Sequence, residues 1–277
     1  MLKTRVLTAI ALLPVVLGML FLAGPAAWAA FAMAIALVSC WEWSRLCGFG
    51  RAAQAAYLAA SLAIAAALAL ALLRGPAAVF ANLAQASFIA SAYFWLFAVP
   101  LWLALRLRPE PWACGLAGWF VAWPMWAALV VLREAGPWVL LAVAALVWVA
   151  DIAAYFAGRR FGRRKLAPAV SPGKTWEGVA GALAGVLAYG LVLDWHAHAA
   201  PGPLTPVFAP AAGAPAVAAM LALAALSVLG DLFESWMKRG AGRKDSSALL
   251  PGHGGVLDRV DALTPVLPAA ALLLALA

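Results

Sequence analysis

The sequence predicts an all-α fold: one polytopic bundle of about nine transmembrane helices with its N-terminus in the cytoplasm. Hydrophobic residues make up 67% of the chain and charged residues 11%, against roughly 45–50% and about 25% in soluble domains. The length of 277 residues allows at most roughly ten crossings of about 20 residues each. These figures exclude a water-soluble globule and a disordered chain, and they predict a single integral membrane domain over residues 1–277.

Nine apolar runs, separated by charged residues or by proline and glycine, are the predicted spans. They cover residues 6–23, 27–44, 55–73, 86–105, 113–132, 137–157, 176–194, 215–234 and 260–277. The first run follows Lys3 and Arg5 like a signal peptide, but it is too long for one and is interpreted as a span. Pro265 and Pro268 interrupt the last run, which neighbouring helices can tolerate.

The basic residues indicate the orientation of the bundle. With the N-terminus inside, 17 of the 19 Lys and Arg residues fall in cytoplasmic segments and only Arg74 and Arg133 fall outside. This asymmetry follows the positive-inside rule. It also explains the net charge of +8 without a nucleic-acid partner, and it places the C-terminus outside if the ninth helix spans fully.

Two sets of small residues are interpreted as structural. Cys40, Cys47 and Cys114 show no C-x-x-C spacing, so they are expected to be buried thiols and not disulfide or zinc ligands. Gly181 and Gly185 form a small-x-x-x-small pair, which predicts close packing of two helices.

The acidic residues point to function in the second half of the chain. Those at span ends or in loops are interpreted as needing no functional role; they are Glu42, Glu110, Glu134 and Asp194. Six others lie within or beside helices from the sixth span onward: Asp151, Glu177, Asp231, Glu234, Asp258 and Asp261. An aspartate at a helix centre costs roughly 2.5–3.5 kcal/mol on insertion, so such residues indicate a functional site. Residues 136–277 are therefore expected to carry the site, and residues 1–135 to be less specific helices.

Residues 230–261 contain the densest polar pattern. Asp231, Ser235 and Lys238 share one helix face at i, i+4 and i+7, whereas Glu234 lies to the side of this stripe. Asp258 lies in the second half of the pattern, and we expect it to face Asp231 and to offer oxygen ligands suited to magnesium. The glycines 254 and 255 would let backbone amides approach an anion. The alternative is a solvated basic loop with capping acids.

Two blocks resemble the phosphatidate cytidylyltransferase family. Positions 235–261 fit its signature: Ser, two residues, Lys-Arg, four residues, Lys-Asp, then Leu-Pro-x-His-Gly-Gly and Asp-Arg-x-Asp. The upstream block runs from Asp151 to Gly178 and includes Ser-Pro-Gly-Lys-Thr-Trp-Glu-Gly. It departs from the family pattern at Ile152 and Gly173.

The resemblance implies condensation of phosphatidate with CTP to CDP-diacylglycerol and pyrophosphate, with magnesium and, as an option left open, a second cation. It implies that Asp231 and Asp258 hold the metal, that the catalytic residue Asp261 is an additional ligand or supports the ligands from behind, and that Lys238 neutralises phosphate. Substrate-binding residues would be Ser171, Lys174, Thr175, Ser235, Arg239, Lys244, His253 and Arg259. His253 is equally compatible with a turn residue. The family further suggests a homodimer in the bacterial inner membrane with a cytoplasmic active site.

Parts of this pattern also occur in proteins with other functions. Another CTP-using lipid transferase or a lipid kinase would show a similar charge pattern, and buried acids also mark ion-coupled transporters. Transporters often carry corresponding interrupted helices in two halves, whereas here the polar residues crowd into one half. Gly173-Lys174-Thr175 ends like a Walker A loop, but Pro168 replaces the required glycine and no strand pattern precedes the motif.

Overall fold

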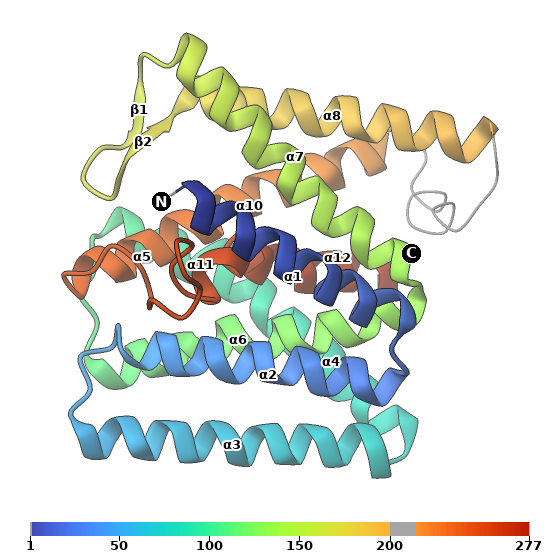
Figure 1. Cartoon of the computed structure of the whole chain (residues 1–277), viewed down its shortest axis with the longest axis vertical. Helices are drawn as coiled ribbons and strands as arrows, with labels where there is room; N and C mark the ends of the chain where they lie inside the picture. The colour runs from blue at the N-terminus through green and yellow to red at the C-terminus, as the bar shows by residue number, and fades with distance from the viewer. Residues whose placement is uncertain (1, 200–213, 277) are drawn as a thin grey trace.

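The computed structural model describes residues 2–199 and 214–276, which form a helical bundle (Figure 1). Its helices are α1 Leu2–Leu22, α2 Pro25–Ser44, α3 Arg51–Arg74, α4 Ala77–Tyr93, the π-helical turn η1 Phe94–Ala98, α5 Val99–Ala104, α6 Pro111–Ala135, α7 Pro137–Phe161, α8 Trp176–Ala199, α10 Ala214–Gly240, α11 Leu257–Val260 and α12 Leu263–Leu276. The all-α class is confirmed.

Seven of these helical segments are long and apolar enough to cross a membrane by themselves; α4, η1 and α5 together make one of them, Ala77–Ala104. The segments Val6–Leu22 and Leu263–Leu276 are apolar but shorter. Each predicted run therefore coincides with a helix, and the protein has several membrane-spanning helices. The count of nine crossings stays a prediction.

One short antiparallel hairpin adds to the helices. Strand β1 Lys165–Ala167 pairs with β2 Ser171–Thr175, between α7 and α8. Residues 173–175, which end like a Walker A loop, lie inside β2 and not in a loop after a strand. A three-residue strand is too short to leave a periodic pattern in a sequence. The sequence of this segment therefore cannot be distinguished from that of a loop.

Helix α6 lies at the centre of the bundle and packs against α2, α4 and α12. Helices α7 and α8 pack mainly against each other and extend to one side (Figure 1). A Cβ atom added at Gly181 would clash with Ala157 and lie 3.0 Å from the Ala153 carbonyl oxygen, and one at Gly185 would lie 2.6 Å from the Ala153 Cβ. The predicted close packing through the two glycines is confirmed. The three cysteines are buried and free, also as predicted.

The loops that carry most of the basic residues gather at one end of the bundle. The connections after α2 and α5, the β1–β2 hairpin and the segment after α10 lie at the left of Figure 1, whereas the α1–α2, α3–α4 and α6–α7 connections lie at the right. The predicted site residues therefore lie at the basic end.

Candidate active site

The two sequence blocks meet at an ion pair between the hairpin and α10. The Lys174 Nζ atom, at the end of β2, lies 2.6 Å from the Asp231 Oδ2 atom. The Ser235 hydroxyl donates a hydrogen bond of 3.2 Å to the Asp231 Oδ1 atom from the next turn of α10. The side chains of Lys174 and Asp231 are 23% and 34% exposed, so a ligand can reach this pair. The predicted stripe on α10 exists at these two positions.

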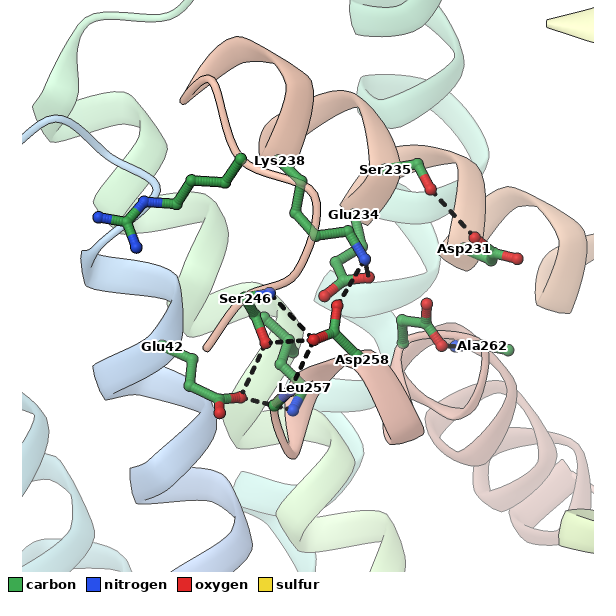
Figure 2. Close-up of polar contacts among 12 residues, drawn as sticks. Glu42, Asp231, Glu234, Ser235, Lys238, Ser246, Leu257, Asp258 and Ala262 are labelled. Atoms are coloured by element: carbon green, nitrogen blue, oxygen red, sulfur yellow. Dashed lines mark hydrogen bonds and ion pairs between the residues drawn. The ribbon is translucent and has the colours of Figure 1, made fainter. Parts of the chain in front are cut away.

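The third residue of the stripe, Lys238, lies in a more buried cluster (Figure 2). Its Nζ atom contacts the Glu234 Oε2 atom at 2.5 Å and the Asp258 Oδ1 atom at 2.6 Å. Glu234 is 2% exposed. Glu234 lies to the side of the stripe but still contacts Lys238, because the two residues are four apart and a long side chain reaches along the helix to this neighbour.

Asp258 is held by its own loop as well as by Lys238. Its Oδ2 atom accepts hydrogen bonds from the Ser246 amide, the Ser246 hydroxyl and the Gly255 amide, at 2.9, 2.9 and 2.7 Å. Gly254 has a φ of +86°, and a Cβ atom there would lie 2.7 Å from Asp258 Oδ2. The anion that these glycines approach is thus a side chain of the protein itself. Burial raises the pKa of Asp258, but the hydrogen bond and charge of Lys238 and the hydrogen bonds from the Gly255 and Ser246 amides together outweigh burial and hold this pKa below its ordinary value.

Glu42, at the end of α2, is a site residue that the sequence reading missed. It is fully buried. Its carboxylate accepts hydrogen bonds from the hydroxyls of Ser246 and Ser247, at 3.2 and 2.5 Å, and from the amides of Val256 and Leu257, at 3.0 and 2.6 Å (Figure 2). Glu42 therefore holds together the loop that carries Asp258. Its contacts are more than 200 residues away in sequence, and no local pattern signals them.

Two further acids complete the group. The Asp261 Oδ1 atom accepts a hydrogen bond from the Ala262 amide at 2.8 Å, and the Asp261 carboxylate interacts electrostatically with Asp231 and Glu234. Asp151, on α7, interacts in the same way with Asp231 and Lys174. Five carboxylates thus surround two lysines. We call this group the carboxylate cluster: Asp151, Asp231, Glu234, Asp258, Asp261, Lys174 and Lys238.

The composition of this cluster suits a hard cation. Its acids outnumber its lysines, and the buried Glu234 Oε1 atom has no hydrogen-bond partner in the part of the chain that the structure describes. A buried carboxylate is unfavourable unless a cationic group or a metal ion pairs with it. Within that same part, no three acidic, His or Cys side chains converge into a ready metal site. Both oxygens of Asp258 and both oxygens of Asp231 already have partners. A cation would reach Asp231 more easily, because its side chain is 34% exposed, by displacing Lys174 or Ser235.

The remaining predicted residues divide between structural and outlying positions. The Thr175 hydroxyl accepts a hydrogen bond of 3.1 Å from the Gly178 amide and so caps the start of α8. The Arg239 guanidinium donates to the carbonyls of Val170 and Arg243 and not to the cluster. The His253 amide donates to the Leu250 carbonyl, as in a turn.

Ser171 begins β2, and Lys244 and Arg259 are exposed. The structure thus brings Lys174, Asp231, Ser235, Lys238, Asp258 and Asp261 together.

Comparison with known proteins matches nearly the whole chain. The sequence profile described as "Cytidylyltransferase family" matches residues 3–277. A phosphatidate cytidylyltransferase of Pseudomonas aeruginosa is 41% identical over 99% of this chain and 97% of its own length. Proteins of the same name from Haemophilus influenzae and Brucella suis are 36% and 38% identical over 97% and 95% of this chain, and 96% and 89% of their own lengths.

Proposed function

Because the chain belongs to the Cytidylyltransferase family, we propose that it transfers a cytidylyl group from CTP to phosphatidate in phospholipid biosynthesis. The products are CDP-diacylglycerol and pyrophosphate. The observation that carries the proposal is the contact between Lys174 and Asp231, because it joins the two blocks of the sequence that resemble the family into one partly exposed site.

The reaction needs positioning and charge neutralisation more than acid–base chemistry. A phosphate oxygen of phosphatidate attacks the α-phosphorus of CTP, a new P–O bond forms, and the bond to the bridging oxygen breaks to release pyrophosphate. The nucleophile is already anionic, so no side chain has to remove a proton. Lys174 is placed to exchange Asp231 for a substrate phosphate, and fixed cationic groups of this kind lower the barrier by stabilising developing charge.

Magnesium is proposed as the cofactor, held by Asp231 and Asp258 as the resemblance implies, with Glu234 and Asp261 adding negative charge beside them. When bound there, a divalent cation would neutralise negative charge on the substrate phosphates. Lys238 keeps Asp258 and Glu234 in place. The second cation of the resemblance remains an option in the same cluster.

The membrane arrangement belongs to the same proposal. We propose nine crossings, an N-terminus in the cytoplasm and an active site at the inner face of a bacterial inner membrane. The basic loops at one end of the bundle support this orientation. Phosphatidate then enters from the surrounding lipid and CTP from the cytoplasm. A homodimer is proposed from the family resemblance.

Purified protein should be incubated with phosphatidate and CTP labelled at either the α- or the γ-phosphate. We expect α-label, and no γ-label, in a chloroform-soluble lipid that depends on phosphatidate. Lipid labelled only from γ-labelled CTP would identify a lipid kinase. α-Label that appears with diacylglycerol and not with phosphatidate would identify another lipid transferase. A folded Asp231→Asn variant is the matched control for contaminating activity.

A further inference from the structure

A cavity lined by arginines lies beside the carboxylate cluster. Its volume is about 600 Å³, within the ~300–1,000 Å³ of typical small-molecule sites. Five arginines line it, and they come from three separate segments of the chain: Arg45, Arg106, Arg108, Arg239 and Arg243. None of the lining residues is acidic. We call this space the arginine cavity.

The arginines lack the partners that would neutralise them. Among residues 2–199 and 214–276, none of the five forms an ion pair with a carboxylate. Arg45 lies over the Trp41 ring at 4.9 Å from its centroid. Arg239 donates to two backbone carbonyls. Five like charges around one cavity repel one another, so the cavity favours a ligand with several negative charges.

Backbone and side-chain contacts fix the segments that carry these arginines. The indole nitrogens of Trp102 and Trp236 both donate to the Leu107 carbonyl, at 3.1 and 3.2 Å, and so tie the turn at residues 106–108 to α10. Arg106 has a φ of +51°, in the left-handed region that non-glycine residues rarely occupy. Such a conformation persists only where surrounding structure holds it, and it concentrates at functional sites.

The cavity is close to the reaction centre along α10. Arg239 follows Lys238 directly, and Lys238 contacts Asp258 and Glu234 in the carboxylate cluster. One flank of the last turns of α10 thus faces the carboxylates and the other faces the arginines. Guanidinium groups form bidentate hydrogen bonds with phosphate oxygens.

We propose that the arginine cavity binds the polyphosphate chain of CTP. This inference rests on the proposed function, which supplies the nucleotide. Phosphate is also present on the lipid substrate, but several arginines without acidic partners match a chain of phosphates better than a single phosphate, which favours the nucleotide.

The test uses Arg108→Gln and Arg243→Gln, singly and together, because the guanidinium groups of these two arginines make no described hydrogen bond. The matched control is Arg160→Gln, which removes the same charge from an exposed arginine of α7 that does not line the cavity. Melting temperature in detergent establishes that every variant is folded.

Binding of CTP and of inorganic pyrophosphate is measured by calorimetry, and KM is measured separately for CTP and phosphatidate. Losing one charged hydrogen-bond donor should weaken CTP and pyrophosphate binding by roughly ten- to a hundredfold, raise KM for CTP and leave KM for phosphatidate unchanged. Arg108→Lys should restore part of the affinity, and Arg160→Gln should match the unaltered protein.

Unchanged CTP and pyrophosphate binding in the folded double variant would overturn the inference. So would a rise in KM for phosphatidate alone, or weaker binding to phosphatidate nanodiscs with CTP binding intact, since the cavity would then serve the lipid phosphate. If the unaltered protein transfers no cytidylyl label, the proposed function fails, and pyrophosphate binding still decides whether the cavity holds polyphosphate.

Discussion

At the scale of single residues, Glu42 organises more of the site than any other acid in the first half of the chain. A buried carboxylate normally requires compensation, and here four donors from the loop 246–257 supply it. The loop in turn presents the Ser246 and Gly255 donors to Asp258. Glu42 is thus a positioning residue that acts through Asp258.

Glu42→Ala should leave these donors without an acceptor and lower stability by on the order of 3 kcal/mol or more, the range for breaking a buried charged interaction. Glu42→Gln keeps the size of the side chain but places an amide NH2 group, a hydrogen-bond donor, among the four donors that contact Glu42. We therefore expect kcat to fall at least about tenfold, with a smaller loss of melting temperature than in Glu42→Ala. Thermal unfolding in detergent and steady-state kinetics measure both. Glu134→Gln, an exposed position, is the control, and a normal kcat in folded Glu42→Gln would remove Glu42 from the site.

Asp231 and Asp258 should respond differently to loss of charge. Asp231→Asn leaves a partly exposed position and should lower kcat by about 10²–10³, the scale of one electrostatic contact to the transition state, with normal folding. Asp258→Asn should lower kcat similarly and also destabilise the loop, because Asp258 anchors Ser246, Gly255 and Lys238.

If the two aspartates share a magnesium site, the double variant should be little worse than either single variant, and each should need more magnesium for half-maximal activity. Near-normal transfer by both folded variants at limiting magnesium would contradict the metal assignment.

At the scale of elements, the sequence predicts the helices well and their mutual contacts poorly. Every apolar run coincides with a helix because hydropathy is a local property. The part of the site that lies on α10 was predicted in part, since Asp231 and Ser235 follow helical spacing. The β1–β2 hairpin was not, because its strands are very short, and the role of Glu42 depends on packing between α2 and a loop far along the chain.

The hairpin positions Lys174 over α10. Lys174→Ala should lower kcat/KM, whereas Lys174→Arg should keep part of the activity because the charge remains and only the geometry changes. A cycle with Asp231→Asn measures their coupling. Because both side chains are partly exposed, we expect a coupling energy of at most about 1 kcal/mol in the free energy of unfolding. The coupling measured from kcat/KM should be larger. Unaltered kinetics in Lys174→Ala would leave this lysine as a topology determinant only.

The packing of α7 on α8 holds the two ends of the hairpin, which connects these helices. Gly181→Val would force the two helices apart at Ala153 and Ala157 and should cost about 1–3 kcal/mol, as for other overpacked positions. Activity should fall too, since the hairpin connects these helices. Ala184→Val, at an exposed position of α8, is the matched control. Equal melting temperatures for the two variants would show that this contact is not tight.

At the scale of the whole molecule, the basic residues and the candidate active site lie at the same end of the bundle. The arginine cavity and the carboxylate cluster lie at the end of the bundle that holds the hairpin and the loops after α2, α5 and α10, whereas the opposite end has few basic residues. One charge pattern therefore serves two purposes. It orients the bundle during insertion, and it concentrates cations where an anionic nucleotide and an anionic lipid would meet.

This coincidence leads to a topological prediction. Single cysteines at Ala248, in the exposed loop after α10, and at Gly24, in the opposite α1–α2 connection where a Cβ meets no neighbour, should react with a membrane-impermeant maleimide from opposite sides. The native cysteines are buried, so their background should be low, and a variant lacking them checks this. A cysteine at Gly202 tests the same outer side, although that position lies outside the described residues.

In intact cells Gly24→Cys should be labelled and Ala248→Cys protected, and inverted vesicles should reverse the pattern. Labelling of both cysteines from one side would mean that the number of crossings between them is even, and the nine-crossing arrangement would then be wrong.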